Sequence, residues 1–103
     1  MPDVQMDKQK ISGALTELKT VLTSKKFSDA IKALEQDQTA FTKAKTNPKN
    51  FLRTMGIALP NSHIEISQLH GQAHTICITK TITFGSGRYK RTITVKICTT
   101  FFL

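Results

Sequence analysis

Three histidines and two cysteines are the residues whose chemistry stands out first in this chain. His70, His74 and Cys77 could bind zinc together with His63, because imidazole and thiolate are good zinc ligands. Their spacing, His70-x3-His74-x2-Cys77, matches no common zinc-binding pattern. We therefore interpret the histidines as surface or structural residues and expect no metal site.

The carboxylates and serines give no catalytic pattern. Glu65 is the only carboxylate after Asp37, so a general acid and base pair in the C-terminal part would lack its second member. Ser86 lies between two glycines in a turn pattern and has no identified base partner. No helix start follows Gly85-Ser86-Gly87 to receive a phosphate group. We predict that the protein is not an enzyme and uses no cofactor.

Cys77 and Cys98 lie in two strand patterns that a hairpin joins. If the numbers of paired residues sum to 175, the cysteines are directly opposite each other and can form a disulfide, whereas a sum of 173 makes them diagonal neighbours. Neither cysteine has the CxxC spacing of a redox or zinc site. Two free thiols in a reducing cytosol and a disulfide formed after export are both open at this point.

The C-terminal third carries positive charge that no acidic residue offsets. The chain has 15 Lys and Arg against 7 Asp and Glu, a net charge of +8, and no acidic residue follows Gly71. Such a surface attracts an acidic protein, nucleic acid or anionic lipid, and a tyrosine within it could stack on a base or sit at a lipid interface. The residues expected to carry binding are Lys80, Arg88, Tyr89, Lys90, Arg91 and Lys96.

The length and composition predict one soluble domain, residues 1–103. A chain of 103 residues supports one modest core, and no run approaches the ~20 apolar residues that cross a bilayer. The first ten residues lack the apolar stretch of a secretory signal. We expect synthesis in the cytoplasm, with export by a route without a conventional signal peptide left open.

Helical periodicity predicts that residues 1–56 are the helical part. Apolar residues recur at spacings of three and four over residues 4–23, which is typical of an amphipathic helix. Ser28 is the expected N-cap of a second helix, and Asp37 that of a third. Asn47-Pro48 predicts the start of another helix, which Gly56 ends.

Alternation with period two predicts a β-meander over residues 62–103, with strands at 63–67, 75–84 and 89–101. A hairpin turn is expected at 85–88, where the glycines allow positive φ. The fold class is therefore α+β, with the helices packed on one face of a three-stranded antiparallel sheet. The residues expected on the apolar face of the hairpin are Ile76, Ile78, Ile82, Phe84, Tyr89, Ile93, Val95, Ile97 and Phe101. The opposite face is rich in threonine.

The region of about residues 30–79 carries a series of short motifs. They are Ala33-Leu34-Glu35-x-Asp37, Phe41, Asn47-Pro48-x2-Phe51-Leu52, Gly56-Ile57-x-Leu59-Pro60, Ile64-x-Ile66 and His74-Thr75-Ile76-Cys77-Ile78. This order resembles the leader segment of nitrile-hydratase-like leader-peptide precursors. The resemblance implies a precursor that modifying or export machinery recognises. The metal-binding cysteine cluster of nitrile hydratase itself is absent, because Ile78-Thr79-Lys80 follows Cys77.

Three hypotheses about function follow. The resemblance implies a leader-type precursor, whose Thr- and Cys-rich tail would be modified and whose partner is a modifying enzyme or an exporter. The charge pattern favours a small basic binding module for an acidic partner, nucleic acid or an anionic membrane. The last strand, from Thr92 to Leu103, favours self-association into a homodimer by pairing of edge strands.

Overall fold

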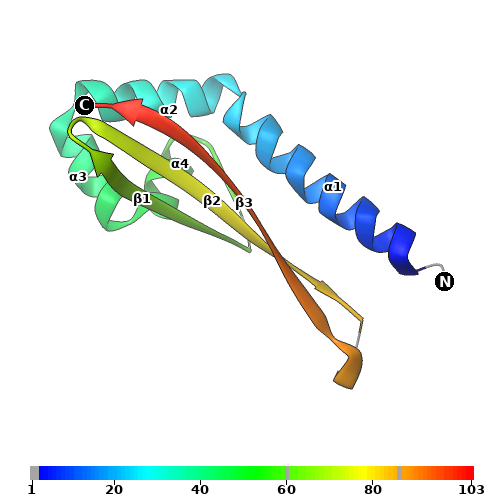
Figure 1. Ribbon diagram of the computed structural model, residues 1–103. Helices are drawn as coiled ribbons and strands as arrows, with labels where there is room; N and C mark the ends of the chain where they lie inside the picture. The colour runs from blue at the N-terminus through cyan, green and yellow to red at the C-terminus, as the bar shows by residue number, and fades with distance from the viewer. Residues whose placement is uncertain (1–2, 60, 86) are drawn as a thin grey trace.

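The computed structural model describes residues 3–59, 61–85 and 87–103, so Pro60 of the Gly56-Ile57-x-Leu59-Pro60 motif and Ser86 of the turn lie outside the described residues. The described residues form helices followed by an antiparallel sheet, which confirms the expected α+β class (Figure 1). The helices are α1 (Asp3–Leu22), α2 (Lys25–Gln36), α3 (Gln38–Thr46) and α4 (Pro48–Thr54). The strands are β1 (Ser62–His70), β2 (Ala73–Phe84) and β3 (Arg91–Phe102), with a 3-10 turn, η1 (Gly87–Tyr89), before β3.

Helix α2 begins earlier than the sequence pattern predicts. Ser24, rather than Ser28, is its N-cap, and the Ser24 side chain accepts a hydrogen bond from the Phe27 backbone N–H at 3.2 Å. The early start places Phe27 in the first turn of the helix, where its side chain is buried. The prediction of Ser28 was wrong because it omitted the burial of Phe27, which fixes where the helix starts.

The other helix boundaries agree with the prediction. The carboxylate of Asp37 accepts a hydrogen bond from the Thr39 N–H at 2.9 Å and caps α3. Asn47 caps α4, with Pro48 in its first turn. Gly56 has a φ of +86°, and this left-handed residue ends the helix.

The sheet has the strand order β1-β2-β3. Paired residues of β2 and β3 sum to 175, from Ala73 opposite Phe102 to Phe84 opposite Arg91. The connecting loop therefore spans residues 85–90, and the expected turn at 85–88 was too short. Gly85 has a φ of +75°, and a Cβ there would lie 2.7 Å from the Tyr89 carbonyl oxygen, so the loop closes tightly on this glycine.

The helices and the sheet share one core. Its most deeply buried large side chains come from both halves of the chain: Leu18, Leu34, Leu52, Ile76, Ile78 and Phe101. Because Ile76, Ile78 and Phe101 all lie on one face of the sheet in this register, the helices cover that face, which we call the inner face. The opposite, outer face contains Cys77 and Cys98.

The molecule is elongated. Its extents are 51 × 25 × 23 Å, and its radius of gyration of 15.8 Å exceeds the roughly 13 Å expected for a compact chain of this length. The cause is visible in Figure 1: β2 and β3 continue beyond the start of β1 as a two-stranded arm. We call the paired strands β2 and β3, with their connecting loop, the ribbon. Pairing between β1 and β2 ends at Ser62 and Lys80, so residues 81–84 and 91–94 form the projecting arm, which we call the distal ribbon.

Candidate functional site

The outer face of the ribbon is a surface of hydroxyl groups. The register places Thr81 opposite Thr94 and Thr83 opposite Thr92, and all four residues are exposed. Nearer the helices, Thr79 lies opposite Lys96. β-Branched hydroxyl residues suit a pleated strand and leave donors and acceptors at its surface, so this face can hydrogen-bond to a polar partner.

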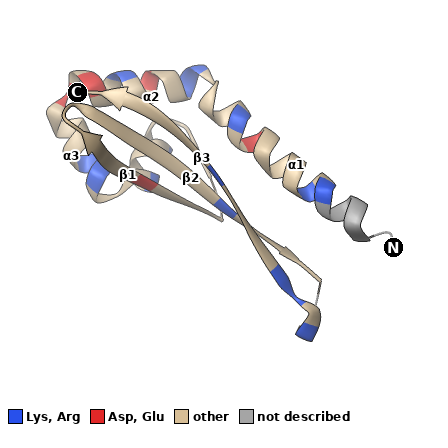
Figure 2. Ribbon diagram, in the orientation of Figure 1, with Lys and Arg blue, Asp and Glu red and all other residues tan. Residues whose placement is uncertain are grey.

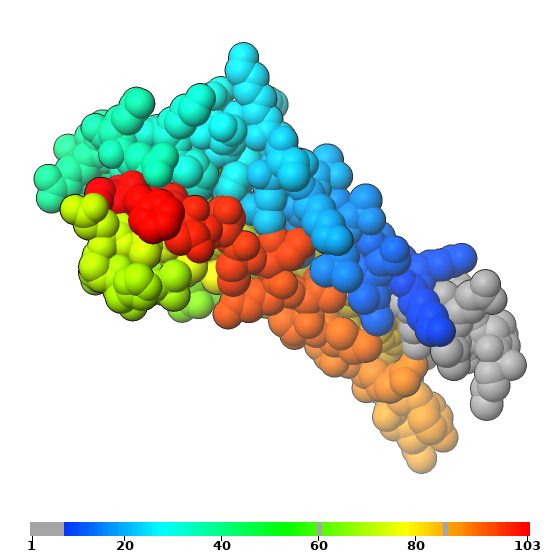
Figure 3. Space-filling model, turned by 45° about the horizontal axis from the view of Figure 1, so that its top comes forward, coloured from blue at the N-terminus to red at the C-terminus, as the bar shows by residue number. Residues whose placement is uncertain are grey.

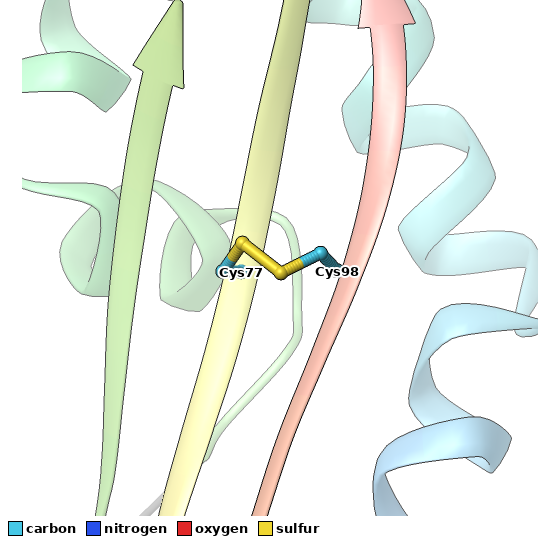
Figure 4. Close-up of a disulfide and its surroundings, with 2 residues drawn as sticks. All are labelled: Cys77 and Cys98. Carbon is cyan, nitrogen blue, oxygen red and sulfur yellow. A yellow bond between two sulfur atoms is a disulfide. The ribbon is translucent and has the colours of Figure 1, made fainter. Parts of the chain in front are cut away.

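A disulfide between Cys77 and Cys98 crosses the outer face (Figure 4). The two residues are directly opposite each other, with their Cα atoms 4.1 Å apart, as the register sum of 175 requires. Of the two possibilities that the sequence leaves open, two free thiols and a disulfide, the structure contains the disulfide. Register decides the matter, since a sum of 173 would have offset the two side chains along the strands.

Lys80 is not on the outer face. Its even number places it with the core residues of β2, and its side chain forms an ion pair with Glu17 of α1 at 2.5 Å. Only 24% of the Lys80 side chain is exposed. Lys80 therefore joins β2 to α1 and offers a partner only a small part of its side chain.

Residues 87–90 of the connecting loop form the tip of the ribbon. The tip holds three of the expected binding residues in exposed positions: Arg88, Tyr89 and Lys90. Tyr89 was expected on the apolar face but is 78% exposed, because β3 begins only at Arg91. Arg91 itself lies at the base of the loop, on the inner side opposite Phe84. The sequence pattern was misleading here because it extended strand alternation into the loop.

Lys96 is the exposed cation of the outer face. Figure 2 shows Lys and Arg along β2 and β3 and at the tip, with no Asp or Glu on these two strands. Arg88, Lys90 and Lys96 together define the cationic surface of the ribbon. It extends from the tip to the level of Thr79.

The inner face is covered less completely than expected. Val95 is buried at 8% exposure and Ile97 is half-buried, but Ile93 is 39% exposed. Ile93 pairs with Ile82 in the distal ribbon, beyond the pairing of β1. The ribbon projects there, so alternation predicted which face Ile93 occupies but not that the face is partly open.

Glu35 of α2 is a contact that sequence reasoning missed. Its carboxylate accepts a hydrogen bond from the Phe102 backbone N–H at 3.2 Å, at the end of β3. The two residues are 67 positions apart, and nothing in the local pattern links them. Only the docking of α2 beside β3 creates this contact.

The histidines do not gather around a metal. His74 is packed between aromatic rings, stacked on Phe101 at 5.6 Å and edge-on to Phe41 at 5.1 Å, and is 9% exposed. Within residues 3–59, 61–85 and 87–103, no group of three His, Cys, Asp or Glu side chains is placed to hold a metal ion. The same residues include no helix that is long and apolar enough to cross a membrane.

No known protein family, curated protein or solved structure matches this chain. Interpretation of the site therefore rests on its own geometry and charge.

A separate pocket of about 380 Å³ lies beside α4, away from the ribbon residues. Its lining residues are Lys49, Arg53, Ile57, Ala58, Leu59 and Asn61. The Lys49 ammonium group donates to the Ser62 carbonyl at 3.3 Å, which holds the start of β1, whereas Arg53 is exposed. Arg53 is thus a surface cation outside the ribbon, suited to serve as a control for charge effects.

Proposed function

We propose that the protein is a non-enzymatic binding module whose cationic ribbon docks an acidic protein partner. The observation that carries this proposal is a set of exposed cations, Lys96 on β3 and Arg88 and Lys90 in the loop before it, with no acidic residue on β2, on β3 or in the loop. Since the helices cover most of the inner face, partners reach mainly the outer face, the tip and the strand edges.

A protein partner fits this surface better than nucleic acid or a membrane does. Five cations lie on β2, β3 and their connecting loop, and Lys80 among them is paired with Glu17, so fewer than five remain for the roughly six to ten phosphate contacts that make DNA binding strongly salt-dependent. A peripheral membrane site needs a continuous apolar face, and the outer face bears threonines instead. Hydroxyl groups beside scattered cations suit the polar rim of a protein interface.

The proposal is tested by titrating a polyglutamate peptide against the protein at two salt concentrations. The variant Lys90→Glu/Lys96→Glu is expected to bind about tenfold more weakly than the wild type, because it reverses two interfacial charges. Arg53→Glu changes an exposed cation outside the ribbon and is expected to bind like the wild type. Equal binding by all three proteins would contradict the proposal. Tighter, steeply salt-dependent binding to duplex DNA or anionic vesicles would also overturn it.

The resemblance to leader-peptide precursors supports a second candidate function. We propose that modifying machinery recognises residues 30–79 and acts on the threonines of the ribbon. The supporting observation is that Thr81, Thr83, Thr92 and Thr94 are exposed on the folded chain, so a modifying enzyme reaches their hydroxyl groups without unfolding the protein.

The mass of the intact protein from its native host tests this second candidate. Loss of water from the ribbon threonines, or a tail removed during export, would support it. An unmodified full-length mass would contradict it. Complete removal of the tail would also take Ile76, Ile78 and Phe101 out of the core, so the remaining segment would be expected to lose its fold.

A further inference from the structure

Along the edge of β3 that lies away from β2, every second residue points its backbone N–H and C=O groups outward. The Cα separation of 4.1 Å between Cys77 and Cys98 marks them as a non-hydrogen-bonded pair, whose own N–H and C=O groups point away from each other. The N–H and C=O groups of the even-numbered residues of β3 therefore point away from β2. The hydrogen bonds at the strand end agree: the Leu103 N–H donates to the Gln72 carbonyl of the β2 side, and the Phe102 N–H donates outward to Glu35.

This edge is bound at one end by α2 and is unpaired by any described strand along the rest, although α1 also contacts β3. Glu35 occupies the N–H of Phe102, but within the described residues no strand pairs with β3 on that side. The residues whose backbone groups point outward along the remainder are exposed: Thr92, Thr94, Lys96 and Cys98. In the space-filling view β3 forms a continuous visible band from the C-terminus toward the tip (Figure 3).

We propose that the β3 edge from Thr92 to Cys98 binds an extended acidic segment of a partner protein as a fourth strand of the sheet. The inference rests on the proposed binding function and specifies how the partner binds. Exposed strand edges recruit extended peptides through backbone hydrogen bonds, and the pockets and charges beside them choose the side chains.

The residues beside the β3 edge differ between the outer and inner faces of the sheet, so they favour a ligand whose residue types alternate along its sequence. On the outer face the added strand would lie beside Lys96, where a carboxylate forms a favourable cross-strand pair. On the inner face it would lie beside Ile93 and Ile97, which are exposed and half-buried, so an apolar β-branched residue would cover them. The expected ligand therefore alternates acidic residues with Val or Ile.

Charge argues against a second copy of this chain as the occupant. Antiparallel pairing of β3 with itself about its centre would place Lys96 near Lys96 of the other copy, and like charges directly opposite each other are destabilising. Both copies would also carry a net charge of +8. An acidic strand removes this repulsion and adds attraction.

Substitution of Thr94 by proline or by alanine distinguishes binding through the backbone of the β3 edge from binding through the Thr94 side chain. The Thr94 N–H points outward, so Thr94→Pro removes an edge donor without removing a hydrogen bond to β2, and proline is tolerated on edge strands in this orientation. Thr94→Ala removes the hydroxyl but keeps the N–H. The probe is a fluorescent peptide of alternating Glu and Val as long as the edge, followed by anisotropy. Thr94→Ala is expected to bind within about twofold of the wild type and Thr94→Pro at least about tenfold more weakly.

Amide exchange of the wild-type protein gives a second measurement that requires no variant to fold. Addition of the peptide is expected to protect the N–H groups of Thr94, Lys96 and Cys98 from exchange, while the odd-numbered amides of β3, already paired with β2, change little. Protection confined to other residues would overturn the fourth-strand inference. Protection of these three amides without peptide, in a protein that elutes as a dimer, would also overturn it in favour of a second copy.

The outcomes distinguish this inference from the proposed function. If Thr94→Pro binds like the wild type while Lys90→Glu/Lys96→Glu does not, the ribbon binds acidic protein by its side chains and the edge inference is wrong. If the wild-type protein binds neither the alternating peptide nor polyglutamate, both the function and the inference are wrong.

Discussion

Ser24 and Ser28 show how one buried side chain decides a helix start. Both serines precede apolar residues at helical spacing, so either has the side chain that an N-cap needs. In the structure Phe27 is buried at 2% exposure, and the helix must include it for its ring to reach the core. Ser24 then caps α2 and Ser28 becomes an exposed residue within it.

Ser24→Ala is expected to lower the free energy of unfolding by about 1 kcal/mol, because it removes the acceptor for the Phe27 N–H. Ser28→Ala is the matched control, and we expect a change within about 0.5 kcal/mol, since alanine is a better helix former than serine at an exposed position. Urea denaturation of the two variants measures both values. A larger loss for Ser28→Ala than for Ser24→Ala would contradict the assigned cap.

The β2–β3 ribbon is attached to the helices and the core at one end and exposed to solvent at the other. The disulfide fixes its outer face, and the ion pair between Lys80 and Glu17 joins its inner face to α1. Beyond Lys80 the ribbon has no β1 neighbour. The same two strands can therefore contribute to the core at one end and offer a free edge and a cationic tip at the other.

Replacement of both Cys77 and Cys98 by serine is expected to destabilise the protein by about 3 kcal/mol. The disulfide closes a loop across a sequence separation of 21 residues, and its loss restores entropy to the unfolded chain. The stability of the wild type should fall by a similar amount in reductant, measured by urea denaturation. The double variant is the control and should not respond to reductant. Equal stability of the oxidised and reduced wild type would count against a structural role for this bond.

The whole molecule is held together by contacts between its two halves. Phe101, the penultimate residue of β3, lies against Phe41 of α3 and His74 of β2, with ring centroids 6.2 and 5.6 Å apart. It is 1% exposed. The end of the chain thus completes the core that the helices begin, and a tail separated from the helices would leave that core open.

Phe101→Ala is expected to lower the free energy of unfolding by roughly 3–5 kcal/mol, because it leaves a cavity among buried rings. Phe102→Ala is a matched control one residue away, since Phe102 is 61% exposed and its backbone hydrogen bond to Glu35 is retained. We expect the control to change stability by about 0.5 kcal/mol or less. Thermal and urea unfolding of both variants measure the difference, and similar losses would refute the assigned burial.

The sequence by itself determined the features that depend on neighbouring residues. Asp37 and Asn47-Pro48 cap helices through atoms two or three residues away, and Gly56 supplies its own left-handed backbone, so their effects are visible in the local pattern. Period-two alternation likewise predicted which face of the sheet the residues within β2 and β3 occupy, although it wrongly extended β3 to Tyr89. The fold class follows from these local signals.

Only the tertiary structure decided the features that depend on distant residues. The register sum of 175 sets the disulfide, because alternation alone is equally satisfied by 173. Glu17 and Lys80 are 63 residues apart, and Glu35 and Phe102 are 67 apart, so the docking of α1 and α2 alone brings them together. The same docking decides that Lys80 faces a helix while Lys96 and the β3 edge face outward. Local sequence limits the conformation of each segment, but long-range packing fixes which surfaces remain for a partner.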